Sequence, residues 1–149
     1  WNMRMSNLQA AVGVAQLEQL DHFISIKRKM GAMYTEGLFD LTNVRLPVDN
    51  LPFATNHYWV YPLVLKNSDG RTAREVTDIL NSKGVGTRPF FFPLHKQPVL
   101  SKYYPRDGEN LPNSEFAAEY GFYLPSGLAL TEEQIECVIE RTRAVLQNK

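Results

Sequence analysis

The sequence contains one cysteine, Cys137, and no excess charge of either sign, because sixteen lysine and arginine residues balance sixteen aspartate and glutamate residues. A single cysteine excludes an internal disulfide and is typical of a reducing compartment, so we expect a cytoplasmic protein. Balanced charge argues against a nucleic-acid-binding surface, which needs a basic excess on one face. We therefore expect no nucleic-acid partner.

Long apolar runs, metal-binding motifs and phosphate-binding loops are also missing. No stretch approaches the ~20 apolar residues of a membrane-spanning helix, so we expect no membrane association. The histidines His22, His57 and His95 lie far apart and form no ligand pattern with Cys137, which favours structural roles over a metal site. Residues 84–86 hold only two glycines and follow a predicted helix, which is the wrong context for a phosphate-binding loop.

The overall composition is that of an ordinary globular protein: the chain has 149 residues, of which 44% are hydrophobic and 21% charged. That length and composition are typical of a single domain with one hydrophobic core. The chain begins with Trp1 rather than methionine, and we expect the natural N-terminus to lie elsewhere.

Helical periodicity is strongest near the beginning of the chain. Ser6 and Gln9 have capping-box spacing, in which the hydroxyl and the amide each accept a bond from a backbone N–H group. Apolar residues then recur every three or four positions, which predicts one long helix that ends at Gly31 or Gly37. Side chains over 10–15 are unusually small, so we expect another element to cross the helix there.

Beyond this helix, strand and helix patterns alternate. Residues 58–65 are rich in aromatic and β-branched types and predict a strand, with Pro62 at an edge, at a bulge or with its nitrogen facing outward. Before this strand, residues 44–56 predict a short strand followed by an irregular loop. After it we expect a helix begun by the Thr72–Glu75 capping box and stopped by Gly84, and then a strand over 85–88. The last two elements are a short helix capped by Asn113 or Ser114 that ends near Gly121, and a helix begun by Thr131 and Gln134.

This order predicts an α/β fold in which helices pack against a sheet. We divide the chain into a connecting helix over 1–37 and a small α/β domain over 38–149.

Two segments contain polar or charged residues in a sequence context that could form a ligand site. Between Thr87 and Pro98, three consecutive phenylalanines lie among prolines, with Arg88 and His95 nearby; the composition fits a ligand-binding wall and a packed loop equally well. In the first segment of the chain, Asn2 and Arg4 precede a helix start. They fit either simple capping or an anion site, because free amides and the helix dipole favour negative charge there.

Four ordered motifs then indicate a family. Residues 2–11, NMRMSNLQAA, resemble the N-x-R-M-S/T-N-L/I-Q-A-A signature of DegT-type sugar aminotransferases. Three further landmarks agree with that family in type and order: WVYPL at 59–63, RP at 88–89 with PLHKQP at 93–98, and LPSGL at 124–128 before TEEQI at 131–135. The resemblance covers essentially the whole chain.

The resemblance implies that this chain is the C-terminal part of a fold-type I enzyme dependent on pyridoxal 5'-phosphate. Such enzymes are usually homodimers and move an amino group from glutamate to a keto-sugar carried on a nucleoside diphosphate. The large N-terminal domain of the family supplies the cofactor-binding lysine, so we assign no catalytic residue here and expect the chain alone to be inactive.

By the same resemblance, Asn2 is the residue that reaches the cofactor phosphate of the partner subunit, and Arg4 is a supporting cation or a salt-bridge partner at the helix start. Arg88 and His95 border the sugar-nucleotide cleft. Two alternatives stay open: a sugar dehydratase of the same family, and a non-catalytic binding or dimerisation domain. The RPFFF run at 88–92 slightly favours enzymes that make GDP-linked 4-amino sugars.

Overall fold

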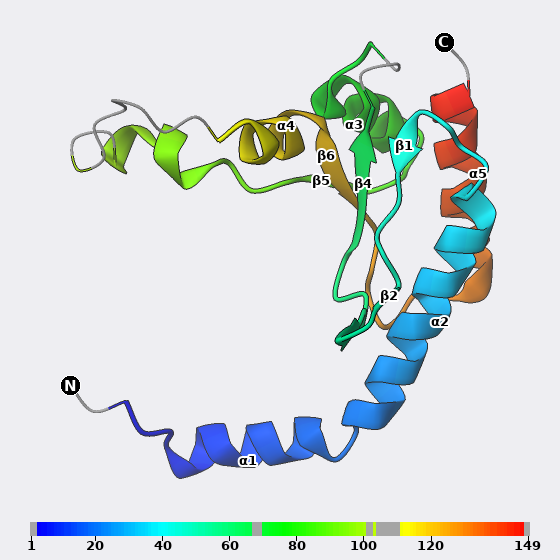
Figure 1. Cartoon of the computed structure of the whole chain (residues 1–149). Helices are drawn as coiled ribbons and strands as arrows, with labels where there is room; N and C mark the ends of the chain where they lie inside the picture. Colours follow the sequence, from blue (N-terminus) through cyan, green and yellow to red (C-terminus); the bar gives the residue numbers. More distant parts are fainter. Residues whose placement is uncertain (1–2, 67–69, 101–102, 104–110, 148–149) are drawn as a thin grey trace.

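The computed structural model describes residues 3–66, 70–100, 103 and 111–147. Its centre is a four-stranded antiparallel sheet in the order β1-β4-β6-β5. Helices pack beside this sheet, and α1 projects away from it as an arm (Figure 1). The predicted mixture of a sheet with packed helices is therefore confirmed. Within the described part of the chain, no helix is both long enough and apolar enough to span a membrane.

Strand β4 (Tyr61–Leu65) is one of the two inner strands and pairs with the other, β6 (Gly121–Leu124), from Tyr61↔Leu124 to Val64↔Gly121. On its other side, β1 (Val44–Arg45) reaches only Val64 and Leu65. Pro62 therefore lies beyond the end of the β1 ladder, where its missing N–H group costs no pairing on that side.

Several strand predictions need correction. The predicted strand over 58–65 begins at Tyr61, because Tyr58 has a positive φ of 51° that ends extended backbone. The predicted strand over 85–88 is instead β5 (Arg88–Pro89), and Val85 lies in the core. Strand β6 was missed because four residues between a helix and the LPSG segment are too few to show a period.

The loop predicted within 44–56 contains a hairpin of β2 (Asn50–Leu51) and β3 (Ala54–Thr55). Its strands are two residues each and exposed at every position, so no alternation of buried and exposed positions marks them in the sequence.

The prediction of a single long N-terminal helix is also wrong, since the structure has two helices, α1 (Asn7–Leu17) and α2 (Leu20–Leu38). The break at residues 18–19 keeps helix-like bonds, with Glu18 N–H donating to the Val14 carbonyl and Phe23 N–H to the Gln19 carbonyl. Residues 18–19 contain neither proline nor glycine, so the sequence carries no breaker at the bend. The Ser6–Gln9 capping box at the start of α1 is confirmed.

Gly31 lies inside α2. The helix ends at Leu38, one residue after Gly37, but Gly37 is not the predicted left-handed C-cap because its φ is not positive. A Cβ on Gly31 would lie 2.4 Å from the Tyr58 ring, and a Cβ on Gly37 would lie 2.6 Å from Ile139 Cγ2. These glycines are therefore required by close packing against other elements rather than by helix termination.

The later helices follow the predictions more closely. The capping box of Thr72 and Glu75 begins α3 (Ala73–Ser82), and Gly84 follows it with φ of 77°. Helix α5 (Glu132–Gln147) begins after Thr131, whose hydroxyl accepts a bond from Gln134 N–H. Helix α4 (Pro112–Tyr120) has Leu111 rather than Asn113 or Ser114 at its N-cap, because Pro112 fits the first helical turn, where no N–H partner is needed. Two short 3₁₀ helices, η1 (Leu94–Lys96) and η2 (Pro98–Leu100), lie between β5 and α4.

The hydrophobic core lies between the sheet and helices α2, α3 and α5. Its largest fully buried side chains are Tyr34, Tyr61 and Phe122. The rings of Tyr34 and Tyr61 are 4.8 Å apart, and burial raises the pKa of Tyr61 to about 12. Because Tyr34 belongs to α2, part of that helix is built into the core; a division of the chain at residue 37 stays a prediction.

Thr142 in α5 is fully buried, and its hydroxyl has no hydrogen-bond partner among the described residues. Burying an unpaired hydroxyl costs about 1–3 kcal/mol. We expect Thr142→Val to raise the free energy of unfolding by about 1 kcal/mol, measured by urea denaturation. Thr77→Val is the matched control, because the Thr77 hydroxyl donates to the Arg74 carbonyl at 3.0 Å and its loss should not stabilise the fold. Equal effects of both substitutions would contradict this explanation.

Candidate functional site

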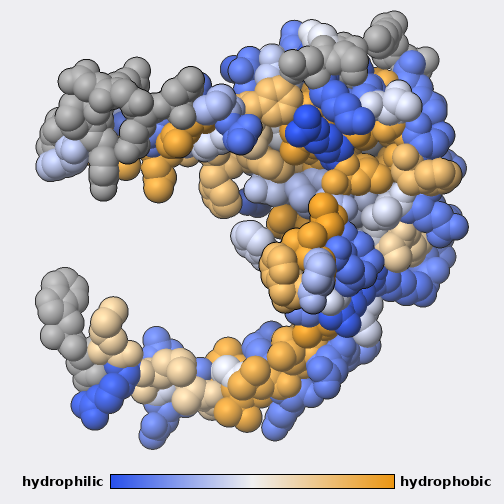
Figure 2. Space-filling model, in the orientation of Figure 1, coloured by the Kyte–Doolittle hydropathy of each residue, from blue (hydrophilic) through white to orange (hydrophobic). Residues whose placement is uncertain are grey.

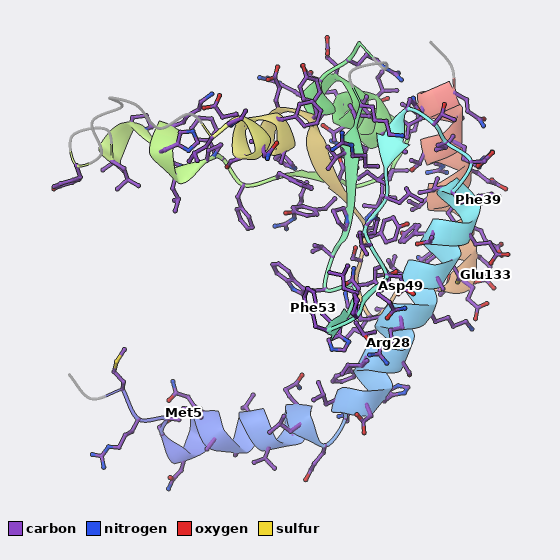
Figure 3. All side chains as sticks on the ribbon, in the orientation of Figure 1. Met5, Arg28, Phe39, Asp49, Phe53 and Glu133 are labelled. Atoms are coloured by element: carbon purple, nitrogen blue, oxygen red, sulfur yellow. The ribbon has the colours of Figure 1, made fainter. Side chains whose placement is uncertain are left out.

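The molecule has the outline of an open C, with α1 as one arm and the segment that holds η1 and η2 as the other (Figures 1 and 2). Both arms carry exposed apolar side chains (Figure 2). Figure 3 shows Phe53, 85% exposed, at the hairpin that faces the open side. The most exposed apolar residues of the arms are Met3, Met5, Leu8, Leu17, Phe91, Leu94 and Val99.

One open pocket of about 410 Å³ lies where α2, the sheet and β5 meet. Its walls come from four stretches of chain that are distant in sequence. They are Lys27 of α2, Trp59 and Val60 before β4, Gly86, Arg88 and Phe91 around β5, and residues 123–126 at the end of β6. None of the described residues that line it is acidic.

Lys27 joins two of these walls. Its ammonium donates to the carbonyl of Trp59 at 3.0 Å and also to the carbonyl of Ser126. Partial burial lowers the pKa of Lys27 below its ordinary value. The Ser126 hydroxyl accepts a bond from Tyr61 N–H at 2.9 Å and donates to the Leu124 carbonyl at 2.8 Å, so the wall after β6 is fixed on both sides.

Arg88, a predicted substrate-side residue, lines the same pocket. Its backbone pairs with Tyr123, and its side chain makes no hydrogen bond or ion pair with any residue that the structure describes. An exposed guanidinium without a carboxylate partner is available to an anionic ligand group.

The three phenylalanines after Arg88 have different surroundings. Phe90 stacks on Tyr123 with ring centroids 4.6 Å apart and lies against Gly121, where a Cβ would come within 2.5 Å of its ring. Phe91 lines the pocket and is 78% exposed, and Phe92 is also exposed. Of these three rings, Phe90 is therefore packed against the sheet and Phe91 lines the pocket.

His95, the other predicted substrate-side residue, does not line this pocket. Its Nε2 lies 3.0 Å from one oxygen of Glu115, and the ammonium of Lys96 lies 2.7 Å from the other. These two bonds hold the pKa of Glu115 below its usual range, and the bond from Lys96 has the larger effect. In this chain the histidine therefore joins η1 to α4, and a role toward substrate stays a prediction.

The predicted cofactor contacts lie at the far end of α1. Arg4 is exposed and precedes the helix, while Asn2 lies outside the described residues. The capping position belongs to Ser6, whose hydroxyl accepts the bond from Gln9 N–H. Apart from its chain neighbours and the backbone of its own helix, no described residue comes within 4 Å of the Cβ position of Gly13. The crossing element expected at the small face of this helix therefore stays a prediction.

The described residues do not form a complete pyridoxal phosphate site. Such a site needs a lysine amine free to bond the cofactor and, commonly, an acidic or basic partner for the ring nitrogen. Lys27 is the lysine of the pocket, but its ammonium is held by two carbonyls, and no carboxylate lies among the lining residues. No step of cofactor chemistry is therefore assigned to these residues.

Comparison with known proteins gives a consistent result. The family model described as "DegT/DnrJ/EryC1/StrS aminotransferase family" matches residues 1–143. The GDP-perosamine synthase of Escherichia coli O157:H7 is 33% identical over the whole of this chain, which spans 38% of that protein. A putative pyridoxal phosphate-dependent aminotransferase, EpsN of Bacillus subtilis, is 32% identical over 93% of this chain and 35% of its own length.

A dTDP-4-dehydro-2,6-dideoxy-D-glucose 3-dehydratase of Saccharopolyspora spinosa is 26% identical over 94% of the chain and 30% of its own length. Among solved structures, DesV of S. venezuelae in complex with a ketimine intermediate superposes with a TM-score of 0.85 and 26% identity over 98% of this chain and 38% of its own. The chain thus spans about a third of the length of the proteins that it resembles.

Proposed function

The chain belongs to the DegT/DnrJ/EryC1/StrS aminotransferase family, and from that premise we propose that its parent protein transfers an amino group from glutamate to a keto-sugar carried on a nucleoside diphosphate. The observation that carries the proposal is the alignment of all 149 residues with a GDP-perosamine synthase at 33% identity. A GDP-linked sugar, and a role in polysaccharide biosynthesis, are the finer parts of the proposal.

In the proposed parent, pyridoxal phosphate supplies a carbonyl group that accepts the amino group from the donor and passes it to the keto-sugar. The remainder of the parent, which we propose includes an N-terminal large domain, holds that cofactor by its lysine. Asn2 and Arg4 then contact the cofactor phosphate of the partner subunit in a homodimer. The exposed apolar side chains of α1 support a covering partner, because rows of exposed apolar residues mark contact surfaces.

The pocket beside β5 supplies the substrate wall of this proposal. Arg88 is available to an anionic group of the substrate, while Trp59 and Phe91 provide aromatic faces for a ring. Arg88 and Phe91 belong to one stretch of chain around β5 whereas Trp59 precedes β4, so the fold has to bring the Trp59 ring to the other two.

A dehydratase is the second candidate, because one relative carries that activity in its name. The two reactions differ in the product: amination replaces the keto oxygen of the sugar with an amino group and turns glutamate into 2-oxoglutarate, whereas dehydration eliminates a hydroxyl group as water and leaves the sugar without nitrogen.

The test uses the full-length parent with pyridoxal phosphate, glutamate and a GDP-linked 4-keto-6-deoxysugar. We expect mass spectrometry to detect an amino sugar and stoichiometric 2-oxoglutarate. A deoxygenated sugar without nitrogen would establish the dehydratase instead. The 149-residue chain alone should give no product, and borohydride should trap no stoichiometric cofactor adduct at a single lysine. Such an adduct would show that a lysine of this chain carries the cofactor.

A further inference from the structure

We propose that Lys27 is a positioning residue whose ammonium holds the two backbone walls of the pocket in place around Arg88. The contact joins three elements through one side chain: α2, the segment that leads into β4, and the segment that follows β6. Lys27 and Ser126 are 99 positions apart, so no local interaction could set this distance.

The two carbonyls that Lys27 binds belong to residues that themselves line the pocket. Trp59 is 74% exposed, and its indole has little packing of its own to fix it. The peptide plane that carries the Trp59 carbonyl also carries Val60, another lining residue. When Lys27 holds this plane, it holds the Cα atoms from which both side chains leave the backbone.

The wall on the other side is held by more than one bond. Ser126 accepts from Tyr61 N–H, and the neighbouring Pro125 carbonyl accepts from the buried Tyr34 hydroxyl at 2.9 Å. The bond from Tyr61 also ties the segment that leads into β4 to this wall. Lys27 adds a second tie two residues earlier, at the Trp59 carbonyl, and so sets the position of that peptide against the same wall. The position of Arg88 is also set relative to β6, because the backbone of Arg88 pairs with Tyr123 of that strand.

The partners of Lys27 separate this role from that of an ordinary surface lysine. Lys29 lies two positions along the same helix, and its ammonium pairs with Glu132 on the surface, where the two side chains are 62% and 60% exposed. Among the described residues, Lys27 instead donates only to main-chain carbonyls, and it is partly buried. A cation that satisfies carbonyls in a pocket wall orients backbone rather than balancing charge.

The first test uses the 149-residue chain and two-dimensional amide spectra. Lys27→Met should shift the amide signals of Val60 and Gly127, whose peptide planes contain the two bound carbonyls. It should also shift the Trp59 indole and the Arg88 Nε–H signals. Lys27→Arg, which keeps a cationic donor, should restore them in large part. Lys29→Met is the matched control and should leave all four signals in place.

If Lys27→Met leaves too little folded protein, Lys27→Gln gives the same comparison with a shorter donor. Unmoved Trp59 and Arg88 signals in a folded Lys27 variant would overturn the proposal. So would equal shifts in Lys29→Met, since they would indicate a general change in α2.

The second test rests on the proposed function and uses the full-length parent. Lys27→Met should raise KM for the keto-sugar about tenfold with kcat nearly unchanged, as expected when only the binding wall moves. Cofactor absorbance should remain, and Lys27→Arg should recover KM. A fall in kcat together with loss of bound cofactor would overturn the positioning role. If the parent shows no aminotransferase activity at all, the amide spectra still decide the role of Lys27.

Discussion

Gly31→Ala should destabilise the chain by about 2 kcal/mol or more, which corresponds to a fall in melting temperature of about 5–10 °C. Alanine favours helix over glycine by about 1 kcal/mol, so helix propensity alone predicts the opposite sign. The steric cost outweighs the gain in helix propensity, because the added Cβ would lie 2.4 Å from the ring of Tyr58.

Tyr58 has little freedom to move away. Its ring is 3% exposed and stacks on Tyr61 at 5.9 Å, its hydroxyl donates to Asp49 at 3.0 Å, and its backbone N–H donates to the Asn56 side chain at 2.7 Å. Its positive φ of 51° shows that the surrounding contacts already hold a disfavoured backbone conformation. Helix α2 and Tyr58 must therefore separate to admit a methyl group.

Gly13→Ala is the matched control for this prediction. Gly13 also lies inside a helix, but apart from its chain neighbours and the backbone of that helix no described residue approaches its Cβ position within 4 Å. In the 149-residue chain this change should be neutral or stabilising by up to about 1 kcal/mol. Thermal unfolding followed by circular dichroism compares the two variants. A Gly31→Ala protein as stable as Gly13→Ala would show that Tyr58 can yield.

Asn2→Ala in the full-length parent should weaken pyridoxal phosphate binding by roughly one to two orders of magnitude. Loss of a hydrogen bond to a charged phosphate costs ~1.5–3 kcal/mol, and each tenfold change in affinity corresponds to ~1.4 kcal/mol. Because the proposed contact crosses the dimer, the variant dimer should also dissociate into subunits more easily than the wild-type dimer when both are supplied with cofactor. Cofactor titration and sedimentation measure the two effects.

Ser6→Ala provides the control, because Ser6 is the observed N-cap of α1. Loss of that cap should lower apo stability by about 1 kcal/mol while the dissociation constant of the cofactor stays the same. If Asn2→Ala behaves like Ser6→Ala, with a lower apo melting point and unchanged cofactor affinity, Asn2 is a structural residue and the proposed cofactor contact is wrong.

Sequence alone determined the features that depend on neighbours a few positions apart. The capping boxes at Ser6 and Thr72 form as predicted, since each needs only a hydroxyl and an acceptor side chain three residues later. The family also followed from ordered local motifs, and the match over residues 1–143 confirms it. Arg88 stood out by its setting among prolines and aromatics, and it does line the pocket.

Tertiary structure decided what depends on distant parts of the chain meeting. Gly31 and Gly37 were predicted as helix stops, yet α2 continues past Gly31 and ends one residue after Gly37, which is not a left-handed cap. The two glycines leave space that Tyr58 and Ile139 need. Lys27 carried no signal at all. Its role arises only when α2 comes to lie beside the Trp59 and Ser126 carbonyls, a contact that periodicity and spacing cannot encode because its partners are 32 and 99 positions away.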